Sequence, residues 1–468
     1  MIKFIRTRGA GLQSKLEIAT EINDDENWTT VFISENGGRK SLLLRCLAEA
    51  ALGNRIYRSP NNTSIEIEPA DVLPDKIIAI SGTPLDRFPR SGTSDLRSKR
   101  KSAKHNNRFV YLGQRSSNGM SGLAQSERSL VGSLISNRHY LSERDTQLNR
   151  AFQTVGLEAE MKVCLRALGN TNPSDFLKKT EFLENSWRIY SQQQESPYQV
   201  EMLSAIERLD SLARSKRLER ALSSIRLSRV ALTISPARIM PRFGLSVPVW
   251  ELLIQSGLAE VSGSLFRRKR SRSSNVHGDQ LSSGQWSWLG SFGALVAELR
   301  NNSLILIDEP ENSLHPSWER KFMPELQQCL DGLSGCQVIV ATHSPLITSG
   351  VSPERGNIRT LKRAQRIDAI TRSEPIDNAF GWNATDVYDG VFGLESTRNP
   401  KFLANANSAL KAIASGNEIS KEQIEIWLTE LNTEKNYLPT FDPMKDIFSD
   451  IISSLEKKLV KSSRRKKK

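Results

Sequence analysis

The sequence predicts an α/β protein with a mixed sheet, a large helical insert and a helical C-terminal module. Short apolar runs bounded by polar residues, at 304–307 and 337–341, indicate buried central strands. A glycine-containing loop at 34–39 separates a β-prone run from a helical one. The segment 142–228 contains few Pro and Gly residues and has helical character. Together these observations favour one large mixed domain carrying helical additions.

The N-terminal part of the sheet domain is expected within residues 1–140. Thr30–Ile33 is β-prone, and Ser41–Leu47 has helical character. Further strands are expected at Lys76–Ile80 and Phe109–Leu112, on either side of a basic, Ser-rich stretch. This order places the first loop between a strand and a helix.

The rest of the chain divides into an insert, a second sheet part and a C-terminal module. Residues 141–235 are predicted as a helical insert, too short and broken for a long coiled-coil arm. Helix-like spacing within it is shown by Leu209, Leu212, Leu218, Leu222 and Ile225. Residues 236–371 would complete the sheet domain, and residues 372–468 would form helices and a basic tail.

Composition favours a soluble globular protein of two or three domains, with 468 residues of which 38% are apolar. No stretch approaches the roughly 20 consecutive apolar residues of a membrane helix. Charges interrupt the apolar run at Met1–Arg6, so no signal-peptide core is expected there. We therefore expect a cytoplasmic protein with no membrane partner. The four cysteines form no CxxC pair and are expected in the core.

The net charge of +13 is unevenly distributed along the chain. Basic runs occur at Arg97–Arg108, Arg267–Arg272 and Lys461–Lys468. Such runs can bind phosphate backbones, so nucleic acid is a possible partner. They can equally be solvated, disordered surface, and charge alone leaves both interpretations open.

The loop at Ser34–Ser41 has the elements of a phosphate-binding loop. Such a loop needs inward backbone N–H groups, a lysine for the outer phosphates and a hydroxyl for magnesium. Lys40 and Ser41 provide the last two. Ser34 and Arg39 stand where the usual pattern has glycines. Taken alone, the loop also fits a surface turn rich in Gly and Asn.

Two acids follow the apolar run at 304–307. Asp308 would hold magnesium, directly or through water, and Glu309 would accept the proton of the attacking water. Acids commonly follow strands, so a charged turn with no chemical role is the alternative.

Two further motifs flank these acids. Ser282 and Gly284 precede an expected helix, whose N-terminus favours anions. His343 follows the strand at 337–341, at the sheet edge where open α/β proteins bind ligands. An ordinary helix cap and a structural histidine are the alternatives.

The order of these motifs, together with Leu314-His315-Pro316, resembles the ABC-type ATPase head, a P-loop NTPase with a mixed sheet. The Leu-His-Pro sequence is similar to the branch that contains RecF, SMC and OLD-type proteins. Within that branch, Ile78–Pro89 and Tyr111–Gln114 resemble bacterial antiphage-defence ATPases of the Septu and retron-associated type.

The resemblance implies ATP and Mg²⁺ as cofactors. It implies that Ser282 and Gly284 reach the γ-phosphate bound by a partner subunit, while His343 contacts it from its own subunit. Gln114 would be the glutamine of the Q-loop. The implied cofactor-binding residues are Asn36, Gly37, Gly38, Lys40, Ser41, Gln114, Ser282 and Gly284, the metal ligands Ser41 and Asp308, and the catalytic residues Glu309 and His343.

The implied function is an ATPase that dimerises as a switch and controls a separate effector, a nuclease candidate, in antiphage defence. A homodimer or higher homo-oligomer is expected. A DNA-repair ATPase like RecF or SMC is one alternative. A nucleotide-binding scaffold with little turnover is another, because Arg39 alters the loop. An OLD-type nuclease is disfavoured, since no Asp-x-Asp follows His343, and the long gap from Ser41 to Leu281 disfavours a transporter subunit.

Overall fold

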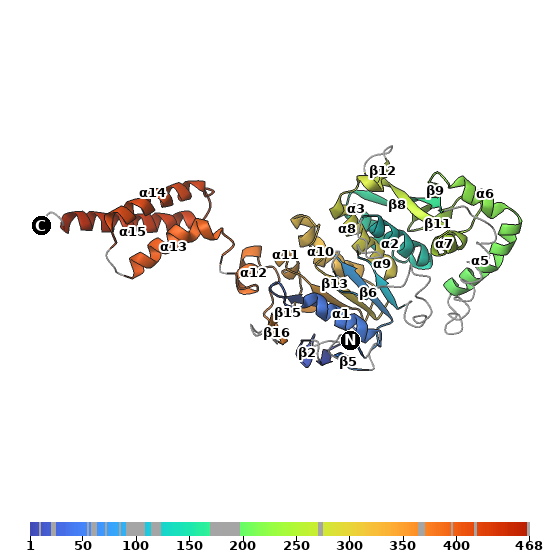
Figure 1. Cartoon of the computed structure of the whole chain (residues 1–468), viewed down its shortest axis with the longest axis horizontal. Helices are drawn as coiled ribbons and strands as arrows, with labels where there is room; N and C mark the ends of the chain where they lie inside the picture. The colour runs from blue at the N-terminus through green and yellow to red at the C-terminus, as the bar shows by residue number, and fades with distance from the viewer. Residues whose placement is uncertain are drawn as a thin grey trace. The chain divides into compact units, whose positions relative to one another are not determined.

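The computed structural model divides the chain into two compact units, Met1–Val387 and Tyr388–Lys468 (Figure 1). The structure describes residues 1–8, 11–19, 25–53, 56–57, 63–70, 73–83, 86–89, 108–113, 123–168, 197–269, 275–363, 370–394, 396–415 and 419–465. None of the helices in these ranges combines the length and hydropathy needed to cross a membrane.

A seven-stranded mixed sheet organises the first unit, in the order β16-β15-β3-β14-β13-β6-β7. Neighbouring strands are parallel, except that β15 and β16 are antiparallel. The strands are β3 (Trp28–Ile33), β6 (Lys76–Ser81), β7 (Phe109–Tyr111), β13 (Ser303–Asp308), β14 (Gln337–Ala341), β15 (Gly356–Arg363) and β16 (Thr371–Ile376). Strands β13 and β14 are buried along their whole length, which confirms them as central strands.

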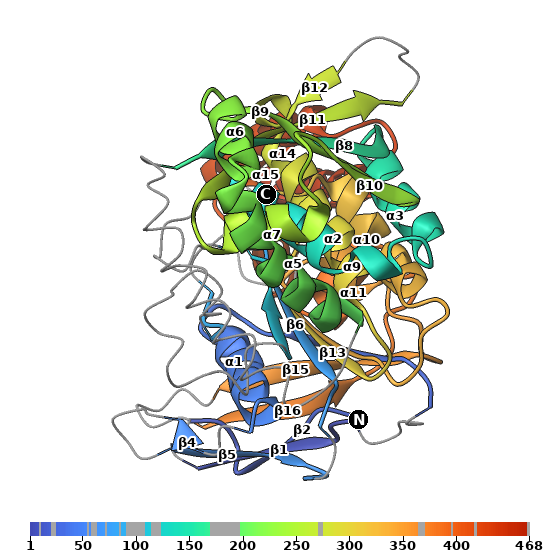
Figure 2. The same cartoon turned by 90° about the vertical axis from the view of Figure 1, so that its right-hand side faces the viewer.

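A smaller antiparallel sheet, ordered β2-β1-β5-β4, accompanies the main sheet. Its strands are β1 (Phe4–Arg8), β2 (Lys15–Glu17), β4 (Ile56–Tyr57) and β5 (Thr63–Glu68). Helix α1 (Lys40–Ala51) shares one hydrophobic core with both sheets, through residues such as Leu43, Ile65 and Leu306. Figure 2 shows α1 beside β6 and β13, with the small sheet below. This packing fixes the start of α1 against the central strands.

A third sheet is antiparallel and ordered β10-β9-β8-β11-β12. Its strands are β8 (Leu157–Ala167), β9 (Arg229–Ser235), β10 (Arg238–Pro241), β11 (Ala259–Arg268) and β12 (Asn275–His277). The helices of this region are α2 (Leu123–Ser136), α3 (Asp145–Thr154), α5 (Pro197–Arg214), α6 (Arg217–Ser224), α7 (Val247–Gln255), α8 (Ser283–Trp288) and α9 (Ala294–Glu298), with a short π-helix at Leu289–Gly293 between the last two.

The predicted insert at 141–235 is therefore helical only in part. Helices α3, α5 and α6 are present, but β8 and β9 were not predicted. In β8 the buried residues Met161, Val163 and Leu165 alternate with more exposed ones, a period of two rather than 3.6. Strand β8 lies between β9 and β11, so its pairing partners come from both sides of the predicted boundary at 235.

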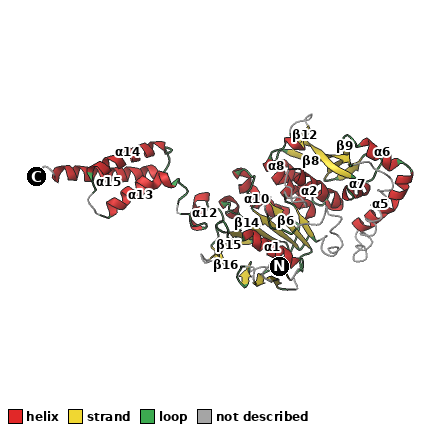
Figure 3. Cartoon of the chain, in the orientation of Figure 1, coloured by secondary structure: helices red, strands yellow, loops and turns green. Residues whose placement is uncertain are grey.

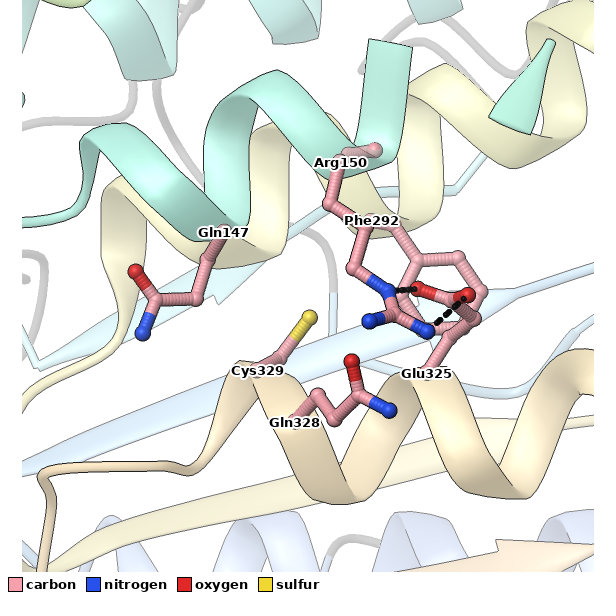
Figure 4. Close-up of a pocket in the computed structure, with 7 residues that line it drawn as sticks. Gln147, Arg150, Phe292, Glu325, Gln328 and Cys329 are labelled. Carbon is pink, nitrogen blue, oxygen red and sulfur yellow. Dashed lines mark hydrogen bonds and ion pairs between the residues drawn. The ribbon is translucent and has the colours of Figure 1, made fainter. Parts of the chain in front are cut away.

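Helix α10 (Pro316–Cys329) links this third sheet region to the central sheet. Arg150 on α3 makes two hydrogen bonds to Glu325 on α10, at 2.7 and 2.9 Å (Figure 4). Arg144, at the start of α3, donates to the backbone oxygens of Cys329 and Asp331. Helix α10 begins just after the acids of β13, so these contacts reach the same segment as the site described below.

The C-terminal unit contains α13 (Pro400–Ala414), α14 (Lys421–Tyr437) and α15 (Met444–Arg465) (Figure 3). These three helices bury their own core, in which Phe402 packs against Phe448. The helical prediction for this region holds, but its start differs. Strand β16 pairs with β15 in the main sheet, and α12 (Ala384–Gly390) begins before the boundary at 387, so the second unit starts later than residue 372.

Candidate nucleotide site

The predicted motifs meet at the carboxyl edge of the seven-stranded sheet. Strands β3, β13 and β14 are parallel, so the segments that follow them emerge on the same side. The register pairs Asp308 with Ala341 on one side and with Ser81 on the other. Ala341 in turn pairs with Phe32, next to the start of the loop. The sheet thus brings together groups that lie hundreds of residues apart in sequence.

Two residues in the loop after β3 have a left-handed backbone conformation. Gly37 has φ of 81° and Arg39 has φ of 69°. A Cβ atom on Gly38 would lie 2.3 Å from the Ser34 hydroxyl, so Ser34 occupies the space beside that glycine. Asn36 and Gly37 lie exposed at the tip of the loop. The loop therefore keeps a tight turn into α1 although two of its usual glycines are replaced.

Arg39 takes the conformation that a glycine would adopt, at a cost of roughly 1–2 kcal/mol. Its guanidinium lies against Gly11, where a Cβ atom would be 1.4 Å from Arg39 Nη1. The pKa of Arg39 is lowered by partial burial and by the charges of Arg363 and Arg87. The arginine side chain is thus accommodated by Gly11, and the added charge stands beside the loop.

Lys40 is buried at the first position of α1. Its Nζ donates to the Ser34 hydroxyl at 3.0 Å and lies 2.6 Å from Nε2 of His343. Burial lowers the pKa of Lys40 to about 8, although Glu309 and other nearby acids oppose the shift. Burial and the charge of Lys40 also lower the pKa of His343. A neutral His343 accepting a hydrogen bond from a protonated Lys40 fits both shifts.

Asp308 and Ser41 form the predicted metal pair. The Ser41 hydroxyl donates to Oδ1 of Asp308 at 3.1 Å. Oδ2 of Asp308 is buried and has no hydrogen-bond partner among the described residues. Burial, with the nearby charges of Glu309 and Asp86, raises the pKa of Asp308 to about 7, against the Ser41 hydrogen bond and Lys40. A buried carboxylate oxygen with an adjacent hydroxyl is the donor set that a hard cation such as Mg²⁺ prefers.

Glu309 is held in an uncommon backbone conformation, with φ of 46°. The Glu309 N–H donates to the Ala341 oxygen at 2.8 Å, and a Cβ on Gly82 would lie 2.1 Å from the Glu309 backbone oxygen. The side chain accepts from Asn312 at 3.1 Å and lies 3.6 Å from Nε2 of His343. Strained residues of this kind concentrate at functional sites. The carboxylate is therefore well placed to accept a proton beside Lys40 and His343.

The signature segment, Ser282–Gln285, is arranged differently. The Ser282 hydroxyl accepts from the Gln285 N–H at 3.2 Å, and the Gln285 side chain accepts from the Ser282 N–H at 2.9 Å. The pair is a capping box at the start of α8. A Cβ on Gly284 would lie 2.8 Å from the Ser313 backbone oxygen. No hydrogen bond between described residues joins Ser282 or Gly284 to Lys40.

Two side chains at this edge, Asp86 and Glu311, were not given roles by sequence reasoning. Asp86 is 5% exposed and accepts hydrogen bonds from the Phe88 N–H and from the Tyr111 hydroxyl. Glu311 accepts from the loop that carries His343. Their positions within a few residues of the ends of β6 and β13 are the signal that would have identified them. Gln114, the predicted Q-loop residue, lies outside the described residues.

The basic runs lie largely outside the described residues as well. The structure covers only Arg108 of the first run and 267–269 of the second, and describes no side chain of 461–468. Arg267 pairs with Glu158 at 3.3 Å, and Lys269 donates to Gln153. A role of these runs in nucleic-acid binding stays a prediction.

Parts of the chain are similar in sequence to known proteins. Over 117 residues the chain is 29% identical to the Septu protein PtuA of Bacillus thuringiensis, covering 25% of this chain and 28% of that one. It is 32% identical over 94 residues to the Retron Vc95 probable ATPase of Vibrio cholerae, covering 20% and 17%. It is 34% identical over 120 residues to protein ea59 of Escherichia phage lambda, covering 26% and 22%.

These matches span less than a third of the length of each relative. They confirm the predicted resemblance to Septu and retron-associated proteins. A crystal structure of an Smc head bound to the C-terminal winged-helix domain of ScpA aligns with 81% of this chain and 98% of that one, at 10% identity and a TM-score of 0.36.

A protein family described as "AAA domain, putative AbiEii toxin, Type IV TA system" matches residues 62–349. The matched range contains the strands β13 and β14, the acids Asp308 and Glu309, and His343. It spans more than half of the 468 residues, and the chain therefore belongs to this AAA-domain family.

Proposed function

We propose that the chain binds ATP with Mg²⁺ at the carboxyl edge of the sheet and hydrolyses it to ADP and phosphate. The observation that carries this proposal is the buried Asp308 oxygen next to Ser41, which lacks a hydrogen-bond partner in the part of the chain that the structure describes. Such an oxygen is costly unless a cation or a donor satisfies it. Ser41 and Asp308 would hold the ion, which when bound neutralises developing charge on the phosphates.

Lys40 and His343 would bind the γ-phosphate from two sides. Their nitrogen atoms are 2.6 Å apart, and the Lys40 ammonium has three N–H donors, so it can donate to a phosphate oxygen beside its contacts with Ser34 and His343. Lys40, with a pKa of about 8, remains mainly protonated at neutral pH and supplies positive charge. The Glu309 carboxylate would orient the attacking water and hold its proton, which is the task of the base in phosphoryl transfer.

A second copy of the chain would complete the site. Ser282 lies exposed at the start of α8, and Gly284, which is buried there, lies close to the backbone of Ser313. An anion bound at Lys40 in one copy and at Ser282 in the other would join the two copies head to tail. Loss of the γ-phosphate would then weaken that interface, so ATP would act as a dimerisation switch.

A nucleotide-binding scaffold with little turnover is the second candidate. Arg39 favours it, because this arginine adds backbone strain and charge to the phosphate loop. In that case nucleotide binding and dimerisation would persist without measurable phosphate release.

The biological proposal is control of a separate effector, for which a nuclease is the first candidate, in antiphage defence. It is supported by the similarity to proteins named Septu protein PtuA and Retron Vc95 probable ATPase. Deleting the gene should remove protection in plaque assays, and the tagged protein should co-purify with products of neighbouring genes. Unchanged protection, with DNA-repair factors as the only partners, would favour a repair ATPase instead.

The test of nucleotide binding is the Lys40→Ala variant of the full chain. We expect ATP affinity in the presence of Mg²⁺ to fall about 10²-fold, since a hydrogen-bonded charge to phosphate contributes roughly 1.5–3 kcal/mol. Isothermal calorimetry measures the change. Lys15→Ala is the matched control, because Lys15 is exposed and pairs with Glu68 on the small sheet. Equal affinity of both variants would refute the site assignment.

A further inference from the structure

We infer that Glu311 is a positioning residue, which holds His343 where the γ-phosphate would bind. The inference rests on the proposed function of the site and adds a residue to it. Glu311 lies in the turn between β13 and α10, two residues after Glu309. It is half-buried, and its carboxylate faces the segment that follows β14 rather than solvent alone.

Both carboxylate oxygens of Glu311 accept hydrogen bonds from the segment that contains His343. Oε1 accepts from the His343 N–H at 2.5 Å, and Oε2 accepts from the Thr342 hydroxyl at 2.8 Å. The Thr342 hydroxyl in turn accepts from the Ser344 N–H at 2.9 Å. The carboxylate therefore fixes three consecutive residues, with His343 at the centre.

The segment needs such a fixed point because it is short and lies between two elements. Strand β14 ends at Ala341, and α11 (Pro345–Thr348) begins four residues later. The His343 ring reaches from this segment across to Lys40, at 2.6 Å, and to Glu309, at 3.6 Å. A small rotation of the His343 peptide would carry the ring nitrogen away from both. Misplacement by about 1 Å can cost on the order of 10²-fold in rate.

A carboxylate suits this task better than an amide. It can accept two hydrogen bonds at two oxygens, whereas glutamine offers one acceptor oxygen and one NH₂ donor. Burial raises the pKa of Glu311, while its hydrogen bonds from His343 and Thr342 oppose the rise. Glu311→Gln should keep one of the two contacts, and Glu311→Ala neither.

The same segment supplies a matched control. The Ser344 hydroxyl donates to Glu319 on α10 at 2.6 Å. Like the Glu311 contacts, this is a hydrogen bond from the segment to a carboxylate. It involves Ser344, the N-cap residue of α11, and not the His343 peptide. Glu319→Gln should therefore leave ATP hydrolysis near the wild-type rate.

The experiment is a double-mutant cycle between Glu311 and His343 in the full chain. We expect Glu311→Ala to lower kcat by about 10- to 100-fold with ATP affinity retained, and Glu311→Gln to lower it less. In a His343→Ala background, Glu311→Ala should cause no further loss, because its effect runs through the histidine. An equal loss in that background would overturn the inference.

A second measurement keeps the inference independent of turnover. The chain has five histidines, so the ring NMR signals of His343 can be assigned by their loss in His343→Ala. Glu311→Ala should shift these signals in the nucleotide-free protein, and Glu319→Gln should not. Shifted signals without hydrolysis in any variant would refute the proposed ATPase activity but support the positioning role. Unshifted signals would overturn the positioning role.

Discussion

The two halves of the candidate site differ in how their polar groups are satisfied. The phosphate-loop half comprises Lys40, Ser41, Asp308, Glu309 and His343. Burial shifts the pKa values of Lys40, Asp308 and His343. Oδ2 of Asp308 has no hydrogen-bond partner within the described ranges. In the signature half, Ser282–Gln285, the side chains of Ser282 and Gln285 satisfy each other's backbone groups.

This difference indicates that the two halves have different roles in nucleotide binding. The phosphate-loop half has a strained backbone and unsatisfied hydrogen-bonding groups. Both features are typical of sites that bind a ligand. The signature half forms a stable helix start by itself and presents it to solvent. The phosphate-loop half would therefore bind the nucleotide. The signature half would contact nucleotide that is bound by another copy of the chain.

The largest expected effect comes from Glu309→Gln in the phosphate-loop half. Removing the proton acceptor should lower kcat by about 10²–10⁴-fold while ATP remains bound, since the loss falls on the chemical step. Single-turnover phosphate release measures the rate, and light scattering after size exclusion detects an accumulated dimer. Glu354→Gln, an exposed glutamate, is the control. Wild-type turnover in Glu309→Gln would exclude Glu309 as the base.

Mixing two inactive variants tests whether the halves belong to different copies. Lys40→Ala lacks a working phosphate loop, and Ser282→Ala lacks the signature hydroxyl. In a head-to-tail dimer, each mixed pair would contain one intact site, so an equal mixture should recover about a quarter of wild-type activity. Ser282→Ala should also lose about 1 kcal/mol of stability as a cap. An inactive mixture that still dimerises would place both halves in one chain.

Arg39→Gly should raise turnover several-fold, if strain in the phosphate loop limits the reaction. Stability should change little, because the relief of roughly 1–2 kcal/mol from the left-handed conformation is offset by glycine's backbone entropy of about 0.5–1 kcal/mol. Arg39→Ala separates strain from charge, since alanine keeps the strained backbone and loses the guanidinium. Turnover unchanged in both variants would show that Arg39 does not limit hydrolysis.

The smallest effect is a pH dependence of stability that belongs to the phosphate-loop half. The pKa of His343 is lowered on folding, so its contribution to stability is present above its unfolded pKa of about 6.5 and is lost as pH falls. The groups that act on its ring are Lys40 and Glu309. The difference in melting temperature between wild type and His343→Gln should therefore decrease as the pH is lowered below 6.5. Parallel curves would mean that His343 titrates as an exposed histidine.

The central strands and the site motifs could be predicted because their signals are local. Apolar runs at β13 and β14, followed by acids or by Thr-His-Ser, indicate buried parallel strands that end at a ligand edge. Strand β8 could not be predicted in the same way. Its alternation is interrupted near its start, and its pairing with β9 and β11 depends on residues 64 to 111 positions away in sequence.

The roles of Glu311 and Arg39 depended on tertiary contacts. In sequence, Glu311 is one more acid after a strand, and only the adjacency of β13 and β14 brings it to the His343 peptide. In sequence, Arg39 is a departure from a glycine pattern. In the fold it keeps a left-handed turn because Gly11, 28 positions earlier, leaves room for its guanidinium.

The sequence by itself determined the fold class, the order of the motifs and the residue types suited to phosphate, metal and proton chemistry, since these depend on hydrophobic pattern and side-chain chemistry. Only the tertiary structure decided which of these groups share one site. The register of parallel strands places Lys40, Asp308 and His343 together and leaves Ser282 on an exposed helix start. The physical reason is that burial and hydrogen bonding across a sheet are set by spatial neighbours, which the linear spacing of residues does not contain.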